Sequence, residues 1–167
     1  KQVLKMDIVN INDVVEDFKK ILRRTIREDI EIEFRLDNNI SLIEADATQI
    51  EQILMNLAIN SQDAMPNGGI MTIETSNVYF DDYLSKKHAK LIPGHYIQLA
   101  FTDNGTGIPA DVIEYIFEPF FTTKDEYKGT GLGLATIYGI VKQHNGGIWV
   151  YSELGKGTTF KIYIPAK

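Results

Sequence analysis

The stretch Gln52-Ile-Leu-Met-Asn56-Leu-Ala-Ile-Asn60-Ser-Gln-Asp63-Ala64 carries three side-chain amides spaced four residues apart. On a helix, residues at this spacing share one face, so Gln52, Asn56 and Asn60 form a polar stripe. A second stripe at helical spacing is apolar and must pack against a core. Its members are Ile50, Ile53, Leu54, Leu57 and Ala64. Because amides buried without partners cost free energy, the polar stripe indicates a face that binds a polar ligand.

Length and composition limit the class of protein. The 167 residues suit one domain, expected over 1–167, with a core of its own. The 17 basic and 23 acidic residues give a net charge of -6, which argues against nucleic acid or a membrane surface as partner. The chain contains no cysteine and no apolar run long enough to cross a membrane. It begins at Lys1, so we expect a piece of a longer protein.

Hydrophobic periodicity predicts the fold class. Besides the helix between its cap at Asp46 and its stop at Pro66, helices are expected at 11–26, 109–117 and 131–145. Strands are expected at 30–36, 41–44, 70–77, 96–102, 148–152 and 158–164. This order predicts an α/β (α+β) two-layer sandwich, in which three helices cover one face of a mixed, mainly antiparallel sheet.

The connection 78–95 is rich in Asp, Lys and Tyr and long for a loop, so we expect it to be exposed and to face a partner. No histidine is assigned chemistry. His144 follows a predicted helix and complements its carboxyl end, while His88 and His95 lie in or beside the long connection.

Asn60 offers an amide oxygen at the edge of the polar stripe. Such an oxygen suits Mg²⁺, which takes few protein ligands and keeps several waters and substrate phosphates. The alternative is a helix amide that is satisfied by its neighbours. The regular spacing of Gln52, Asn56 and Asn60 favours the ligand role without deciding it.

Asp103 is expected at the carboxyl end of strand 96–102, before Asn-Gly105-Thr-Gly107. Glycines there allow a ligand to approach the backbone closely. The carboxylate can accept a hydrogen bond from the exocyclic amine of adenine, whereas guanine presents an acceptor at the same place. The alternative is that Asp-Asn-Gly marks only a turn.

The motif Gly129-Thr-Gly131-Leu-Gly133-Leu134 leads into the helix 131–145. Backbone N–H groups and the positive end of the helix dipole favour an anion there, and phosphate is the natural occupant. The spacing differs from the dinucleotide fingerprint and from the P-loop, and glycines before a helix are also common without a ligand.

The segment 104–130 is rich in Gly and Thr, so it is expected to form a mobile lid. It contains Phe117-Glu-Pro-Phe120-Phe121-Thr-Thr-Lys124, in which Lys124 is able to reach a terminal phosphate. The three aromatic residues belong either to the core or to a hinge or docking surface of the lid.

Taken in order, these motifs resemble the catalytic ATP-binding domain of sensor histidine kinases, whose fold is shared with gyrase, the mismatch-repair ATPases and the heat-shock chaperone ATPases. The segment 52–64 resembles the N box of that family, 103–107 the first glycine box, 117–124 the F box and 129–133 the second glycine box. Gly155-Lys-Gly157-Thr158-Thr-Phe160 resembles its closing segment. The resemblance covers nearly the whole chain and implies the Bergerat-type ATP-binding fold.

The resemblance also implies the site. Asn60 would hold Mg²⁺, Asp103 would bind the adenine amine beside Gly107 and Thr158, and Asn56 and Lys124 would be catalytic. The remaining implied contacts to ATP are Asp63, Gly105, Ile108, Phe120, Thr130, Gly131, Leu132, Gly133 and Leu134.

Asn56 separates two branches of this family. In the related ATPases the matching position carries a glutamate that activates water, and an amide cannot act as a base. The resemblance therefore implies a domain that binds Mg·ATP, hydrolyses it poorly and transfers the γ-phosphoryl group to a histidine. No histidine here lies in the sequence context of a phosphoacceptor, so that region is expected elsewhere.

The expected partners are the dimerisation and phosphotransfer helices of the same protein, as a homodimer, and the receiver domain of a response regulator. The domain is expected in the cytoplasm without membrane contact, whether or not the full protein is membrane-anchored. Two alternatives stay open: an ATPase of the same fold and a non-catalytic nucleotide-binding docking module.

Overall fold

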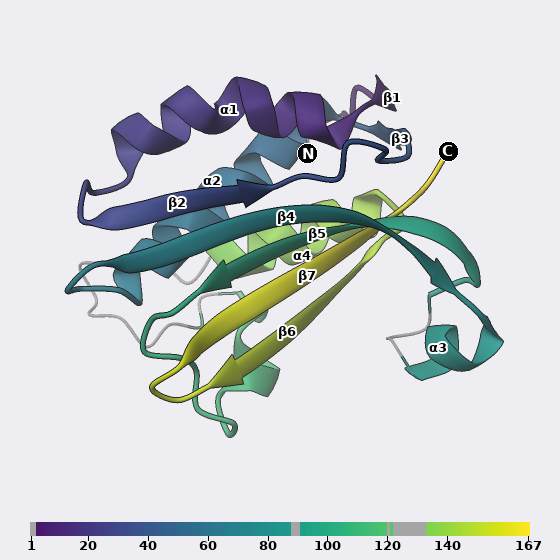
Figure 1. The fold of residues 1–167 in the computed structure, drawn as a ribbon. Coiled ribbons are helices and arrows are strands. Elements are labelled where there is room, and N and C mark those ends of the chain that lie inside the picture. The colour runs from purple at the N-terminus through teal and green to yellow at the C-terminus, as the bar shows by residue number, and fades with distance from the viewer. Residues whose placement is uncertain (1–2, 88–90, 120, 122–132) are drawn as a thin grey trace.

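The computed structural model describes residues 3–87, 91–119, 121 and 133–167. They form two layers, a sheet and a set of helices packed on it (Figure 1). The strands are β1 (Asp7–Val9), β2 (Ile30–Arg35), β3 (Ile43–Ala45), β4 (Gly69–Phe80), β5 (Gly94–Asp103), β6 (Gly147–Glu153) and β7 (Gly157–Pro165). The helices are α1 (Ile11–Thr25), α2 (Ala47–Asp63), α3 (Asp82–Lys87) and α4 (Gly133–Gln143), with one 3₁₀ helix, η1 (Ile113–Tyr115).

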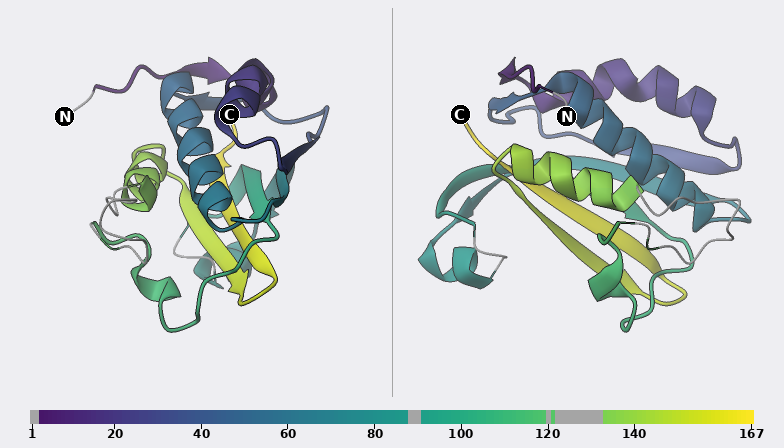
Figure 2. Two further views of the ribbon diagram at one scale, coloured as in Figure 1. Left: turned by 90° about the vertical axis from the view of Figure 1, so that its left-hand side faces the viewer. Right: turned by 180° about the vertical axis from the view of Figure 1, so that it is seen from behind.

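The main sheet has five strands in the order β2-β4-β5-β7-β6. β2 pairs with β4 in parallel, and the other pairs are antiparallel. α1, α2 and α4 cover the same face of this sheet (Figure 2). The predicted two-layer sandwich, mixed and mainly antiparallel with three helices on one face, is therefore confirmed. β1 and β3 form a small second sheet that the sequence pattern did not predict in full.

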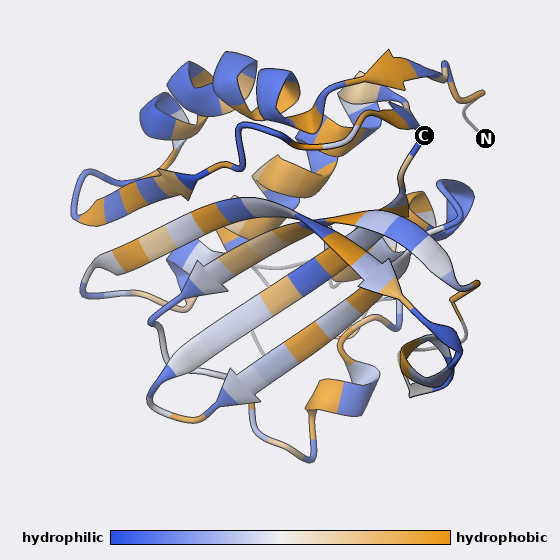
Figure 3. Ribbon diagram, turned by 45° about the vertical axis from the view of Figure 1, so that its right-hand side comes forward, coloured by the Kyte–Doolittle hydropathy of each residue, from blue (hydrophilic) through white to orange (hydrophobic). Residues whose placement is uncertain are grey.

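The core lies between the sheet and the helices. Ile97, Leu99 and Phe101 alternate along β5, are buried, and belong to the same hydrophobic cluster as the apolar stripe of α2. Along β2 hydrophobic and hydrophilic residues alternate, as Figure 3 shows. The period-2 pattern thus turns one face of the sheet toward the helices. Among the described helices, none has the length and apolar character needed to cross a membrane.

The connection 78–95 is more ordered than the prediction of an exposed loop. β4 continues to Phe80, α3 follows, and β5 begins at Gly94. Phe80, Leu91, Tyr96 and Tyr163 form a second buried cluster, separate from the main core. The exposure predicted for this connection is confirmed for most of its described residues, whereas Phe80, Ser85 and Leu91 are buried. The predicted helix 109–117 is also reduced, to the single 3₁₀ turn of η1.

α2 begins at a side-chain cap and is joined there to α4. The carboxylate of Asp46 accepts hydrogen bonds from the N–H groups of Thr48 (3.0 Å) and Gln49 (3.3 Å). The Asp46 N–H donates to Nε2 of the buried His144 (3.1 Å), and Nδ1 of His144 lies 2.8 Å from the Ile140 carbonyl. These partners require a neutral imidazole with its proton on Nδ1. His144 therefore satisfies the end of α4, as predicted, and in addition forms a neutral bridge to α2.

The cap predicts a pH-dependent loss of stability. We expect Asp46→Ala to lower the free energy of unfolding at pH 7 by about 0.5–2 kcal/mol, the usual range for such caps. The hydrogen bond from the Lys5 N–H is the main cause that lowers the pKa of Asp46. The stabilisation by the ionised Asp46 carboxylate is therefore present above the pKa of Asp46 in the unfolded chain, about 3.9. It is lost as the pH falls through the lower pKa of Asp46 in the folded protein. Urea titrations from pH 7 downward measure this, with exposed Asp17→Ala as control; a deficit that stays constant with pH would contradict it.

Candidate functional site

The polar stripe of α2 lies where the sequence predicts it. Gln52 is exposed and Asn56 and Asn60 are half-buried, while Ile53 and Leu57 on the other side of the helix are buried in the core. Asp63, at the end of α2, is exposed. The amide side chain of Asn60 makes no hydrogen bond to the described residues, so the neighbours of this helix amide do not satisfy it.

Asn56 joins this stripe to the start of α4. Its Nδ2 donates to the carbonyl of Gly133, the first residue of α4, at 3.3 Å. Gly133 itself is exposed and Leu134 is half-buried against the main core. Through Asn56, the amide stripe therefore faces the amino end of α4. This arrangement is expected if the stripe and the glycine motif before α4 contribute to one site. Phe120, Lys124, Thr130, Gly131 and Leu132 lie outside the described residues.

Asp103 ends β5 beside α2 and is 5% exposed. Its carboxylate accepts hydrogen bonds from the Gly105 N–H (2.9 Å), the Ser61 hydroxyl and the Thr158 N–H. Burial raises the pKa of Asp103, and the three donors act against that shift. Since Ser61 follows Asn60 in α2, the carboxylate and the unpaired amide belong to the same region of the fold. Ser61 was not singled out in the sequence, where an isolated serine gives no signal.

Gly105 and Gly107 are required by backbone packing. A Cβ on Gly105 would collide with the carbonyl of Ala64, and one on Gly107, which has φ of +79°, would collide with the carbonyl of Glu153. Between them the Thr106 N–H donates to the Ala64 carbonyl (2.9 Å), and the Thr106 carbonyl accepts from the Gly155 N–H (2.8 Å). The segment 103–107 is thus fastened between the end of α2 and the β6–β7 hairpin.

Ser152 holds Ile108 and Thr158 together. Its Oγ accepts from the Ile108 N–H (2.7 Å), donates to the Gly157 carbonyl (3.0 Å) and lies 2.8 Å from Thr158 Oγ1. Ser152 and Thr158 are also paired across the β6–β7 hairpin. This residue was missed in the sequence, where only its place at the end of a predicted strand, 148–152, was apparent. Ile108 and Thr158, both predicted site residues, are therefore brought next to Asp103.

The described residues contain no group of three or more His, Cys, Asp or Glu side chains that could hold a metal ion. The predicted Mg²⁺ ligand, Asn60, is of a different kind, because an amide oxygen serves a metal that is held mainly by water and phosphate. The described part of the predicted lid, 104–119, is attached to the hairpin and to α2, and the rest of the lid reaches beyond the described residues.

Comparison with known proteins identifies the family. The family model described as "Histidine kinase-, DNA gyrase B-, and HSP90-like ATPase" matches residues 45–167. The chain belongs to this family, and membership implies that the domain binds ATP. Within it, the similarity is to sensor histidine kinases, as the sequence motifs suggested.

Two similar proteins, one of them in two solved structures, support this assignment. The sensor kinase CckA of Brucella abortus (strain 2308) is 46% identical over 165 residues, 99% of this chain and 18% of the relative. The catalytic domain of the histidine kinase ThkA has a TM-score of 0.74 and 29% identity, covering 98% of this chain and 99% of that one. ThkA in complex with the response regulator protein TrrA has a TM-score of 0.75 and 27% identity, covering 100% and 43%. The chain thus spans about a fifth of the length of CckA.

Ser152 offers a test of how the site is held. Ser152→Ala removes the acceptor of the part-buried Ile108 N–H, and a hydrogen bond contributes about 0.5–1.5 kcal/mol to stability. We expect a loss of that size in the free energy of unfolding, measured by urea denaturation. Ser76→Ala, on a half-buried serine of β4, is the matched control. Equal stability of the Ser152 and Ser76 variants would show that the contacts around Ser152 do not hold Ile108.

Proposed function

We propose that this domain binds Mg·ATP and presents its γ-phosphoryl group to a histidine in the dimerisation and phosphotransfer helices of a two-component sensor kinase. The observation that carries the proposal is the meeting of three features in one region: the amide stripe of α2, the buried Asp103 and the start of α4. Phosphoryl transfer rests on positioning and charge neutralisation, and such a site offers both without a covalent nucleophile.

Asn60 is the proposed ligand of Mg²⁺. The fit rests on its half-buried side chain, whose amide has no hydrogen-bond partner among the described residues. Mg²⁺ bound there would neutralise charge on the phosphates of ATP. The residues of the chain contribute the orientation: the carbonyl of Gly133 fixes Asn56, and the core fixes the rotation of α2.

Asp103 is proposed to select adenine. An ionised carboxylate has about four acceptor positions, and the N–H groups of Gly105 and Thr158 and the Ser61 hydroxyl occupy three of them. The fourth position is proposed to accept the exocyclic amine of adenine. Gly107, Ile108 and Thr158 are proposed to contact the base, as are Gly105 and Asp63; the bond from the Gly105 N–H to Asp103 and the contacts of Ser152 with Ile108 and Thr158 support this.

The phosphates are proposed to bind at the amino end of α4, where Gly133 and Leu134 begin the helix. Thr130, Gly131 and Leu132, with Lys124 and Phe120 from the lid, are proposed to complete this part of the site. Asn56 is proposed to act in transfer without activating water, because its amide is not a base and is engaged with Gly133.

The acceptor histidine and the partners follow from the same proposal. His144 is buried and bonded to Asp46, so it is not available as an acceptor. The acceptor is proposed to come from helices of the same homodimeric protein, and the phosphoryl group to pass to the receiver domain of a response regulator. The similarity to ThkA, which has been captured with a response regulator protein, supports that partner. A cytoplasmic position agrees with it.

Calorimetry with Mg·ATP, followed by measurement of released phosphate in the same sample, tests the function. We expect micromolar binding, about -8 kcal/mol, with almost no phosphate release. We expect Asn60→Ala to remove the dependence of affinity on Mg²⁺ and to keep the fold. Steady phosphate release would favour an ATPase of the same fold, and absence of binding would favour a docking module. Equal affinity of the unmutated domain with and without Mg²⁺ would exclude the role of Asn60.

Asp103 provides the test of base selection. Asp103→Ala should weaken ATP binding by about 1.5–3 kcal/mol, the scale of a hydrogen bond to a charged group. The preference for ATP over GTP should fall with it, and calorimetric titrations with both nucleotides measure this. Exposed Asp111→Ala is the control. A variant that keeps the full preference for ATP would refute the assignment.

A further inference from the structure

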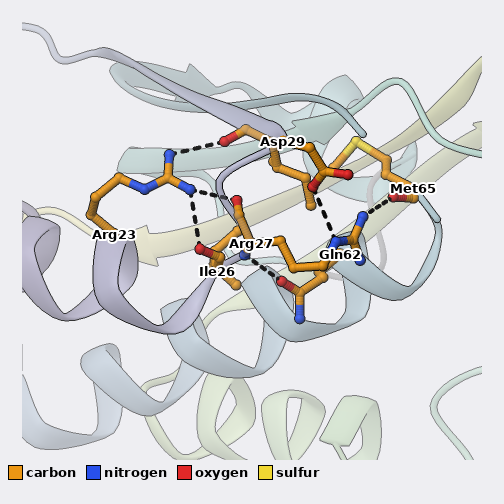
Figure 4. A network of polar contacts seen from close by, with 7 residues as sticks. Arg23, Ile26, Arg27, Asp29, Gln62 and Met65 are labelled. Carbon is orange, nitrogen blue, oxygen red and sulfur yellow. Dashed lines mark hydrogen bonds and ion pairs between the residues drawn. The ribbon is translucent and has the colours of Figure 1, made fainter. Parts of the chain in front are cut away.

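The loop between α1 and β2 lies against the turn that follows α2 (Figure 4). Arg23, in the last turn of α1, fixes the conformation of this loop. Its guanidinium donates to the carbonyls of Ile26 (3.1 Å) and Ile30 (2.9 Å) and also to that of Arg27. The loop 26–30 therefore has a defined conformation and is anchored to α1.

Arg27 reaches from this loop to the end of α2. Its guanidinium donates to the carbonyl of Met65, and its backbone N–H donates to Oε1 of Gln62 at 2.7 Å. Nearby, the Gly69 N–H donates to the carbonyl of Asp29 at 3.3 Å. The turn 64–69 is thus held at both of its ends by the loop 26–30, although the two segments are far apart in the sequence.

The same turn carries the loop proposed to recognise adenine. The Ala64 carbonyl accepts from the Thr106 N–H (2.9 Å), and the Ile70 N–H donates to Oδ1 of Asn104 (2.9 Å). Gly105 packs so closely on Ala64 that a side chain there would collide. Arg27 and Thr106 therefore bind carbonyls of neighbouring residues, Met65 and Ala64, from different segments of the chain.

The hydrogen bonds of Arg27 to the end of α2 and the turn after it contribute more to this arrangement than the ion pair with Asp29. The ion pair of Arg27 with Asp29 (3.0 Å) joins side chains that are 40% and 50% exposed, and such pairs contribute little in water. Hydrogen bonds from a charged donor to a carbonyl are stronger than neutral ones. The charged guanidinium makes such a bond to the Met65 carbonyl, and the neutral N–H of Arg27 adds a second bond, to Gln62.

We propose that Arg27 is a positioning residue for nucleotide selection, which acts through the turn 64–69 on the loop that holds Asp103. The inference rests on the proposed function, because it needs Asp103 to recognise the base. Without the guanidinium, the turn keeps only the bonds from the Arg27 N–H to Gln62 and from the Gly69 N–H to Asp29, so it is held less firmly against the loop 26–30. The loop 103–107 then moves relative to α2, and the bond from the base to Asp103 is weakened more than the contacts to the phosphates.

Two measurements on Arg27→Ala test this. The first is hydrogen exchange of the Thr106 amide without nucleotide, which we expect to become about tenfold faster, the scale of one weakened hydrogen bond. The second compares affinities for ATP and for inosine triphosphate, which carries a carbonyl where adenine carries the amine. We expect the preference for ATP to fall by about tenfold and the affinity for inosine triphosphate to change little.

Arg24→Ala, on an exposed arginine in the last turn of α1, is the matched control and should change neither quantity. Arg27→Lys keeps one charged donor and should restore part of both. Should Arg27→Ala fail to fold, Gln62→Ala removes the other contact and should give the same two changes.

Unchanged exchange at Thr106 in the Arg27 variant would overturn the inference, as would an equal loss of affinity for both nucleotides. Should the unmutated domain bind neither nucleotide, the proposed function fails and the inference on selection falls with it. The exchange measurement still shows separately whether Arg27 positions the turn.

Discussion

Burial of the apolar stripe of α2 against the sheet is the constraint on which the site depends. Ile50, Ile53 and Leu54 are fully buried, so the rotation of α2 about its axis is fixed by the core. A helix turns by about 100° per residue, and a shift of one residue would carry Asn56 away from Gly133 at the start of α4. The geometry of the polar stripe is therefore a consequence of hydrophobic packing on the opposite side of the same helix.

The second half of the site is held by backbone contacts. Asp103 is buried at the end of β5, where donors from α2 and from the hairpin converge on its carboxylate. Gly105 and Gly107 allow the following segment to lie directly against the carbonyls of Ala64 and Glu153. The glycines that the sequence associates with a ligand are thus needed first for the protein to pack on itself. A base bound there would contact a surface whose shape is already fixed by these backbone contacts.

Much of the fold and of the candidate site was predictable, because the features that indicate them involve residues close together in the sequence. The stripe on α2, the cap at Asp46 and the alternation along β2 and β5 depend on residues a few positions apart, which helix and strand geometry relates directly. The burial of Phe80 and Leu91 within the mostly exposed connection 78–95 was not predictable, because their partners Tyr96 and Tyr163 come from other parts of the sheet. The prediction of a helix at 109–117 was wrong because one favourable first position at Pro109 does not sustain a helix.

The sequence by itself determined the two-layer class, most of the helices and strands and the candidate residues of the site, because hydrophobic periods, caps and glycine motifs involve residues that are close in the sequence. Only the tertiary structure decided that Ser61 and Thr158 donate to Asp103, that His144 is a neutral bridge, and that Arg27 holds the turn after α2. The partners in these contacts are separated by 35 to 98 residues along the chain. Which residues form such pairs depends on how the helices pack on the sheet, and local sequence patterns do not contain this information.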